Sequence, residues 1–169
     1  VLLEQNAQAL AEAGLDRVNV SLDNMSAHRY RHMTRGGDIR RVLAGIEAAR
    51  ETGLNPVKLN CVVEHSPDEP DARQVAAFAE REGLQVRFIE RMRPLEGTFA
   101  MVHGGSGGAC EQCNRLRLSA DGEIRPCLFS DDSYSVRELG AHRAIQKAIL
   151  NKPEAGGICE YNWIRRIGG

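Results

Sequence analysis

The chain has 169 residues, a length that suits one medium domain or a large piece of a bigger protein. Its net charge of −1 excludes a general attraction to nucleic acid or to an acidic membrane surface, so an anion would have to be bound by local clusters of Arg and Lys. With 42% hydrophobic and 27% charged residues the composition is that of an ordinary globular protein, and no apolar run approaches the roughly 18 residues of a membrane span. We therefore expect no nucleic-acid partner and no membrane anchor.

The start of the chain and its cysteines indicate a compartment. The first residue is Val1 and a helical pattern begins at once, so we expect the true N-terminus to lie further upstream. The opening residues lack the basic flank and the apolar length of a signal peptide. Five cysteines, an odd number, favour reduced thiols and metal ligation over a disulfide framework. A cytoplasmic location is the expectation.

Strand and helix patterns alternate through the first ninety residues. Apolar spacing, β-branched runs and glycine stops predict a helix ending at Gly14, a strand over 17–22, a loop with a short helical piece over 23–38, a helix over 39–52, a strand over 57–63, a helix over 71–82 and a strand over 84–90. This order is typical of right-handed parallel βαβ units and of an α/β fold. Three strands cannot close a barrel, so we expect part of the sheet to lie outside the chain.

The pattern changes after Glu90. Residues 91–109 contain Pro94 and five glycines with little periodicity, which predicts a loop or linker. A cysteine-bearing hairpin with a turn at Asp121-Gly122 should follow, and then one helix from about Ser135 to Leu150. The chain ends in a basic tail.

Three cysteines stand within eighteen residues, as Cys110-x-x-Cys113 and then Cys127. A C-x-x-C on a turn lets two thiolates reach one metal, and a third from an adjacent strand completes a face. Structural zinc usually takes four ligands, and the candidates for a fourth, His103 and Cys159, have no standard spacing to the others. Three thiolates with an open fourth position suit a [4Fe–4S] cluster, which we favour over zinc. By contrast, Cys61 lies in an apolar strand and should be a core residue.

Two arginines follow the C-x-x-C motif. Arg115 and Arg117 are two apart on a predicted strand, so their side chains point to the same side. Such a pair can simply be a solvated face, but like charges on one face repel unless an anion neutralises them. Guanidinium groups match phosphate oxygens in a bidentate manner. The pattern therefore predicts a phosphate ligand beside the metal. Arg125 is linked to that ligand only by its proximity in sequence.

The run from Cys110 to Cys127, with Asn-Arg-Leu-Arg-Leu-Ser-Ala-Asp-Gly between the second and third cysteines, resembles the C-terminal cluster of the radical-SAM GTP 3′,8-cyclases of the MoaA type. That family makes the first intermediate of molybdenum cofactor biosynthesis. Further segments are similar to the same family: Val20–Asp23, Arg35–Asp38, Pro56–Asn60, Arg87–Glu90 and the terminal Gly168-Gly169. The resemblance covers almost the whole chain, except residues 93–108.

The resemblance implies a partial (β/α) radical-SAM barrel over 1–92, a linker over 93–109 and a small region over 110–169 that binds a [4Fe–4S] cluster and GTP. It assigns Cys110, Cys113 and Cys127 to the cluster, whose free iron would take the guanine base. It assigns GTP to Arg115, Leu116, Arg117 and Lys58, and S-adenosylmethionine to Ser21 and Met92. Arg87 would line the cavity in which these ligands bind. The Gly-Gly tail would reach an active site of the same or a neighbouring subunit, which leaves a homodimer open.

Elementary chemistry agrees with several of these assignments. Ligands of parallel barrels bind at the carboxyl ends of the strands, where Ser21 and Met92 stand. A lysine in an apolar strand, such as Lys58, is costly unless it meets an anion or lies in water at the mouth of a barrel.

Two departures from the family pattern matter. The sequence has no C-x-x-x-C-x-x-C, the family's ligand motif for the cluster that cleaves S-adenosylmethionine, and its 91–109 segment is much shorter than the family's. We expect a fragment of a longer cyclase, inactive in isolation, rather than a degenerate relative. The alternatives are a non-catalytic module that binds a nucleotide beside zinc or an iron–sulfur cluster, and another radical-SAM enzyme with an auxiliary cluster, although such enzymes usually carry more cysteines there.

Overall fold

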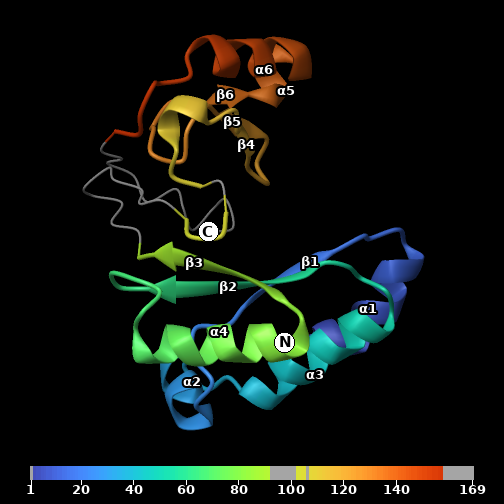
Figure 1. The fold of residues 1–169 in the computed structure, drawn as a ribbon. Coiled ribbons are helices and arrows are strands. Elements are labelled where there is room, and N and C mark those ends of the chain that lie inside the picture. Colours follow the sequence, from blue (N-terminus) through green and yellow to red (C-terminus); the bar gives the residue numbers. More distant parts are fainter. Residues whose placement is uncertain (1, 92–101, 106, 158–169) are drawn as a thin grey trace. The chain divides into compact units, whose positions relative to one another are not determined.

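A computed structural model describes residues 2–91, 102–105 and 107–157. They form two compact units: one runs to Arg91 and takes in Val102–Gly105, and the other holds the described residues from Gly107 onward. The structure is mixed α/β, with one parallel and one antiparallel sheet, each of three strands (Figure 1). None of the helices in these residues is long and apolar enough to cross a membrane.

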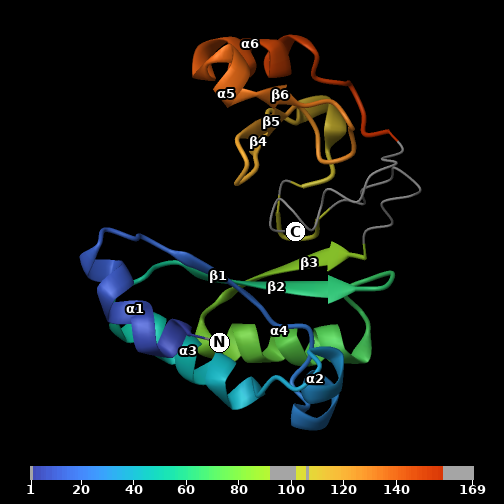
Figure 2. The same ribbon diagram turned by 180° about the vertical axis from the view of Figure 1, so that it is seen from behind.

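The first unit follows the predicted alternation of strands and helices. Its elements are α1 (Leu3–Glu12), β1 (Val18–Ser21), α2 (Ala27–Met33), α3 (Ile39–Glu51), β2 (Val57–Val63), α4 (Pro70–Glu82) and β3 (Gln85–Glu90). The strands lie in the order β1-β2-β3 and all pair in parallel, which confirms the βαβ prediction. The helices lie on one side of this sheet in both views of the ribbon (Figures 1 and 2). Closure into a barrel stays a prediction.

Local sequence explains where the helices begin and end. The Asp38 side chain accepts a hydrogen bond from the Arg40 N–H at 3.0 Å and so caps α3. Helix α4 starts with Pro70, whose ring presets the helical φ and lacks an N–H that would otherwise go unpaired. It ends at Gly83, which has φ +67°, a conformation that glycine adopts without steric cost.

The core lies between the helices and one face of the sheet. Four alternate residues of β2 are buried there: Val57, Leu59, Cys61 and Val63. Each such apolar side chain contributes about 1.5–3 kcal/mol by leaving water. Burial of the Cys61 thiol, together with the charge of Asp23, raises its pKa to about 12, so the thiol stays neutral. The expectation that Cys61 is a core residue is confirmed.

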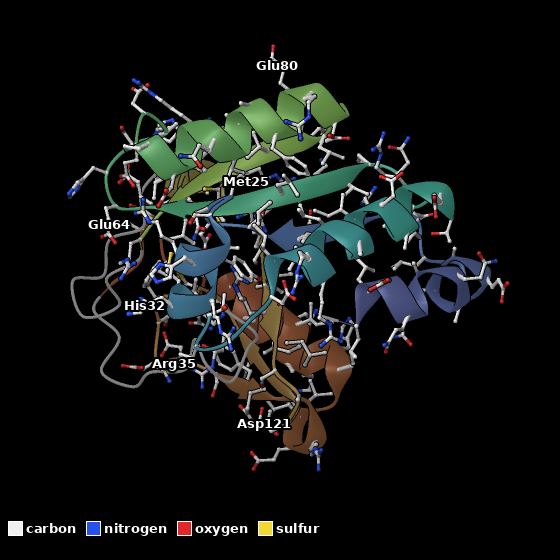
Figure 3. The ribbon with its side chains drawn as sticks, turned by 90° about the horizontal axis from the view of Figure 1, so that it is seen from below. Met25, His32, Arg35, Glu64, Glu80 and Asp121 are labelled. Carbon is white, nitrogen blue, oxygen red and sulfur yellow. The ribbon has the colours of Figure 1, made fainter. Side chains whose placement is uncertain are left out.

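The second unit is built on a short antiparallel sheet. It contains the 3₁₀ helix η2 (Cys110–Gln112), strands β4 (Arg117–Leu118), β5 (Glu123–Arg125) and β6 (Tyr134–Ser135), and helices α5 (Val136–Leu139) and α6 (Ala141–Leu150). The predicted turn joins β4 to β5: Gly122 has φ +90°, and Asp121, labelled in Figure 3, accepts a hydrogen bond from the Ser119 hydroxyl. Ala144 and Ala148 of α6 are buried against Ile124 of β5, and these small side chains bring the helix close to the sheet.

The prediction of one helix from about Ser135 to Leu150 is wrong. The segment forms α5 and α6 with a break at Gly140, whose φ of +75° and ψ of +154° no helix can contain. Tyr134 and Ser135 belong to β6, a third strand that was not predicted. The apolar spacing continues across the break, which is why the periodicity concealed it.

Residues 102–105 pair with the first unit although they fall in the predicted linker. His103 and Phe88 exchange two main-chain hydrogen bonds, each of 3.0 Å. A Cβ on Gly104 would lie 2.7 Å from the carbonyl oxygen of Val86, so this close approach to β3 requires glycine. The boundaries predicted at 1–92, 93–109 and 110–169 stay a prediction.

Candidate metal and nucleotide site

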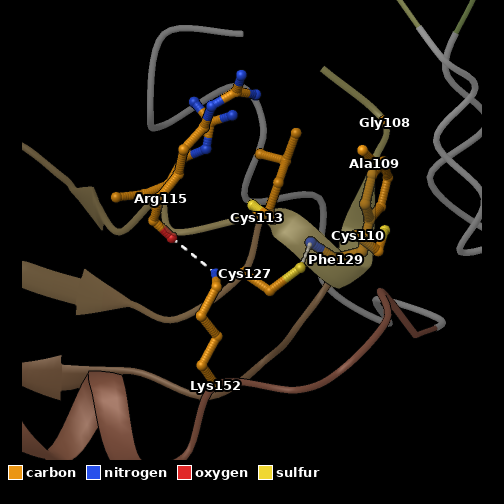
Figure 4. A pocket seen from close by; sticks show the side chains of 10 residues that line it. Gly108, Ala109, Cys110, Cys113, Arg115, Cys127, Phe129 and Lys152 are labelled. Carbon is orange, nitrogen blue, oxygen red and sulfur yellow. Dashed lines mark hydrogen bonds between the residues drawn. The ribbon is translucent and has the colours of Figure 1, made fainter. Parts of the chain in front are cut away.

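The second unit contains a pocket lined by cysteines and basic side chains. Both groups singled out in the sequence open onto it, namely Cys110, Cys113 and Cys127, and Arg115 and Arg117, and they are joined by Lys152 (Figure 4). The walls are completed by apolar groups, among them Leu128 and the ring of Phe129. The pocket therefore brings three thiols and three cations together within one unit.

Short backbone elements position the cysteines. The turn η2 begins at Cys110, and the Cys113 N–H donates to the Cys110 carbonyl at 3.0 Å, so the two side chains of the C-x-x-C motif leave the same turn. Cys127 comes two residues after β5, and its sulfur accepts a hydrogen bond from the Phe129 N–H at 3.4 Å. The three thiols thus come from a turn and from the segment directly after β5.

The Cys113 thiol is tuned toward its anionic form. A hydrogen bond from the Arg115 backbone N–H and the positive charge of Lys152 hold the pKa of Cys113 below its usual range. A thiolate, rather than a thiol, is the form that binds iron or zinc.

Although the three cysteines line one pocket, they do not form a complete metal centre in this arrangement. Among the residues that the structure describes, no three His, Cys, Asp or Glu side chains are grouped closely enough to hold a metal ion. The three thiols nevertheless fit a [4Fe–4S] cluster by their chemistry, because they open onto one pocket and face cations that offset the negative charge of thiolate ligands. Of the two candidates for a fourth ligand, His103 belongs to the first unit, with its Nε2 3.9 Å from the Glu90 carboxylate, and Cys159 lies outside the described residues.

Two basic residues of this unit have structural roles that the sequence did not indicate. The Lys152 ammonium donates to the carbonyl oxygens of Arg115, at 2.8 Å, and of Pro126, at 2.6 Å. Arg125 is only 3% exposed and donates to the carbonyls of Ser130 and Asp131, which close the loop after Cys127. No spacing rule marks Lys152, since 24 residues lie between it and Cys127 in the sequence. For Arg125, the sequence indicated only its proximity to the predicted ligand.

In the first unit, the sheet face away from the helices carries the other predicted ligands. Ser21, Asn60 and Arg87 are partners across β1, β2 and β3, so their side chains form one row on one face. Lys58 stands two residues before Asn60 on the same face and is half-buried. The Oδ1 atom of Asn60 is buried and has no hydrogen-bond partner among the residues that the structure describes. Met92 and the Gly-Gly tail lie outside the described residues.

This arrangement is polar where a sheet buried on both faces would be apolar. Charged and amide groups are costly to bury without partners, so their gathering on the sheet face away from the core favours a polar ligand. All four residues lie in segments that resemble the family; the resemblance assigned roles to Ser21, Lys58 and Arg87, whereas Asn60 was noted only as part of a motif.

Comparison with known proteins finds a family match for each of the two units. Residues 1–79 match the family model of the radical SAM superfamily, and residues 91–156 match the model named Molybdenum Cofactor Synthesis C. The chain belongs to the radical SAM superfamily, in the group that carries this molybdenum cofactor synthesis region. More particularly, it is similar to bacterial proteins named GTP 3′,8-cyclase, which confirms the family indicated by the motifs.

Three of these relatives indicate the extent of the match. Identity is 33% to the protein of Listeria monocytogenes (strain EGD-e) and 32% to that of Petrotoga mobilis, over 90% of this chain and 61% and 64% of theirs. It is 36% to the protein of Moorella thermoacetica, over 81% of this chain and 56% of that one. The chain therefore spans about three fifths of the length of the curated relatives it matches. The Listeria alignment extends over 204 residues although this chain has 169, so the relative holds additional residues inside the matched region.

Proposed function

We propose that this chain binds GTP beside a [4Fe–4S] cluster for the reaction of a GTP 3′,8-cyclase, which forms (8S)-3′,8-cyclo-7,8-dihydroguanosine 5′-triphosphate in molybdenum cofactor biosynthesis. The observation that carries the proposal is the pocket itself, in which three thiols, Arg115 and Arg117 meet within one unit. The names of the relatives supply the identity of the nucleotide.

The cysteines and the arginines of the pocket have different roles in binding. A [4Fe–4S] cluster would be held by Cys110, Cys113 and Cys127 and would supply one iron without a protein ligand, at which the guanine base could bind. Arg115 and Arg117 neutralise the phosphates and orient them through bidentate hydrogen bonds. Holding the base and the triphosphate at once fixes the ribose between them, and positioning of this kind is the protein's main contribution to radical chemistry.

The polar sheet face of the first unit would hold the remaining groups. Ser21 and Met92 are assigned to S-adenosylmethionine, Lys58 to GTP, and Arg87 to a position that lines the same cavity. The half-buried Lys58 supports this, because a partly buried ammonium group is stable only beside an anion or water. The 169 residues contain no C-x-x-x-C-x-x-C, so binding rather than turnover is the property of this chain to test.

The test is anaerobic reconstitution of the chain with iron and sulfide, followed by EPR of the reduced protein with and without GTP. We expect one [4Fe–4S] cluster whose signal changes when GTP is added and does not change with ATP. Arg117→Ala should weaken GTP binding by about tenfold or more, because a charge-assisted hydrogen bond contributes about 1.5–3 kcal/mol. Arg143→Ala, an exposed arginine on α6 of the same unit, is the matched control and should bind like the wild type.

A different result would favour the non-catalytic module. Stoichiometric zinc in protein purified without added iron, with no iron–sulfur spectrum and no GTP binding, would indicate a structural zinc site formed by the same thiols.

A further inference from the structure

We propose that Lys152 is a positioning residue of the cysteine pocket, which holds the two cysteine-bearing segments together and places a fixed positive charge beside the cluster. The inference rests on the proposed function only for the cluster, since the contacts of Lys152 stand without it. Nothing in the sequence motifs or in the assigned ligands includes this lysine.

The contacts of the ammonium group carry the first part of the proposal. Its two acceptors are the carbonyl of Arg115, two residues after Cys113, and the carbonyl of Pro126, directly before Cys127. Figure 4 shows the first of these bonds. Both bonds, at 2.8 and 2.6 Å, are as short as charge-assisted hydrogen bonds usually are. One side chain therefore bridges the C-x-x-C turn and the strand end that supplies the third thiol.

Lys152 is itself held by helix α6. Its backbone N–H donates to the Ile149 carbonyl at 3.2 Å, so it continues the last turn of the helix. The helix is fixed to the sheet through Ala144 and Ala148, which are fully buried and pack with Ile124 of β5. Because the base of the side chain is fixed in this way, its ammonium group can restrain the two segments instead of merely following them.

The charge of Lys152 carries the second part. The lysine lines the same pocket as the three cysteines, so its positive charge lies beside the thiols. With two of its three N–H groups committed to carbonyls, the ammonium is a fixed point charge and differs from Arg117, which we assign to phosphate. Reduction of a cluster adds a negative charge, so a nearby cation stabilises the reduced form and makes the midpoint potential less negative.

The experiment compares Lys152→Met, Lys152→Gln and Lys152→Arg with Lys147→Met, the control, which removes an exposed lysine from the same helix. Hydrogen exchange on the apo chain reports on residues 110–118 and 123–130, and the reconstituted chain reports the rate of cluster loss and the midpoint potential. We expect Lys152→Met to speed exchange in both segments, to lose its cluster about tenfold faster and to have a more negative potential. Lys152→Arg should restore the potential, and Lys147→Met should match the wild type.

Each outcome decides one claim. If Lys152→Met exchanges and holds its cluster like the wild type at the same potential, Lys152 is an ordinary surface lysine and the inference is wrong. If Lys152→Met does not fold, Lys152→Gln, which keeps a donor and loses the charge, must still shift the potential. If the wild type takes up no cluster, the proposed function fails, while exchange in the apo chain still decides whether Lys152 joins the two segments.

Discussion

Gly156→Ala tests how tightly the wall of the pocket is packed. A Cβ at position 156 would lie 2.9 Å from the Cβ of Phe129 and 3.1 and 3.3 Å from two atoms of its ring. Carbon atoms normally rest 3.5–4.0 Å apart, so either the ring or the chain must move by several tenths of an ångström. Phe129 is only 4% exposed, and movement of its ring would disturb neighbours in turn. Overpacking of this kind costs about 1–3 kcal/mol.

The assay is urea denaturation of the chain followed by circular dichroism, with a thermal melt as a second measure. For a unit of this size, each kcal/mol should lower the melting temperature by about 4–8 °C. Gly157→Ala is the matched control, because the nearest atom to its new methyl group is the Phe129 carbonyl oxygen at 3.8 Å, an ordinary contact. Because the Phe129 N–H also donates to the Cys127 sulfur, Gly156→Ala should in addition weaken cluster retention. Equal stability of the two variants would refute the packing argument.

Three further substitutions test other parts of the structure. Leu59→Ala empties a fully buried site in β2 and should cost about 2–5 kcal/mol in urea denaturation, whereas Val62→Ala, on the exposed face of the same strand, should cost well under half of that. Arg125→Met leaves two carbonyls of the following loop without their donor and should cost about 1.5–3 kcal/mol, with no loss if the arginine is merely a surface charge. Hydrogen bonds from the main chain of His65 and its neighbours hold the pKa of Glu69 below its usual range. The ionised Glu69 carboxylate therefore stabilises the folded chain above about pH 4.3, and this contribution is lost as the pH falls through the lowered pKa of Glu69. The melting temperatures of wild type and Glu69→Gln should therefore differ at neutral pH and converge in acid, and a constant difference would contradict the assignment.

The parallel sheet could be predicted because each of its elements has a strong local signal. The β2 strand alternates buried residues with half-buried or exposed ones, and Gly53 and Gly83 mark helix ends through a φ that other residues rarely adopt. Such signals are properties of a few neighbouring residues, so the sequence alone carries them. The break at Gly140 was missed because a glycine inside an apolar period is compatible with either a continuous helix or an interruption.

The pocket could be predicted only in part, for a different reason. The spacing of Cys110, Cys113 and Cys127 is a local motif, and the structure brings all three to one pocket with Arg117. Lys152 acts through main-chain carbonyls 26 and 37 residues earlier in the chain, and main-chain acceptors leave no trace in a sequence. The assignments of Ser21, Lys58 and Arg87 came from family resemblance, and no spacing rule would have grouped residues from three different strands.

The bonds of Lys152 also have a thermodynamic consequence for the end of the chain's last described helix. Because the lysine extends α6 and its side chain joins two walls of the pocket, fraying of this helix end and opening of the pocket are linked equilibria. A ligand that binds only the closed pocket must then stabilise α6 by mass action, by about 2.7 kcal/mol when its concentration is a hundred times its Kd. Occupancy of the pocket would thus determine how often the end of α6 is unwound and can be cleaved by a protease.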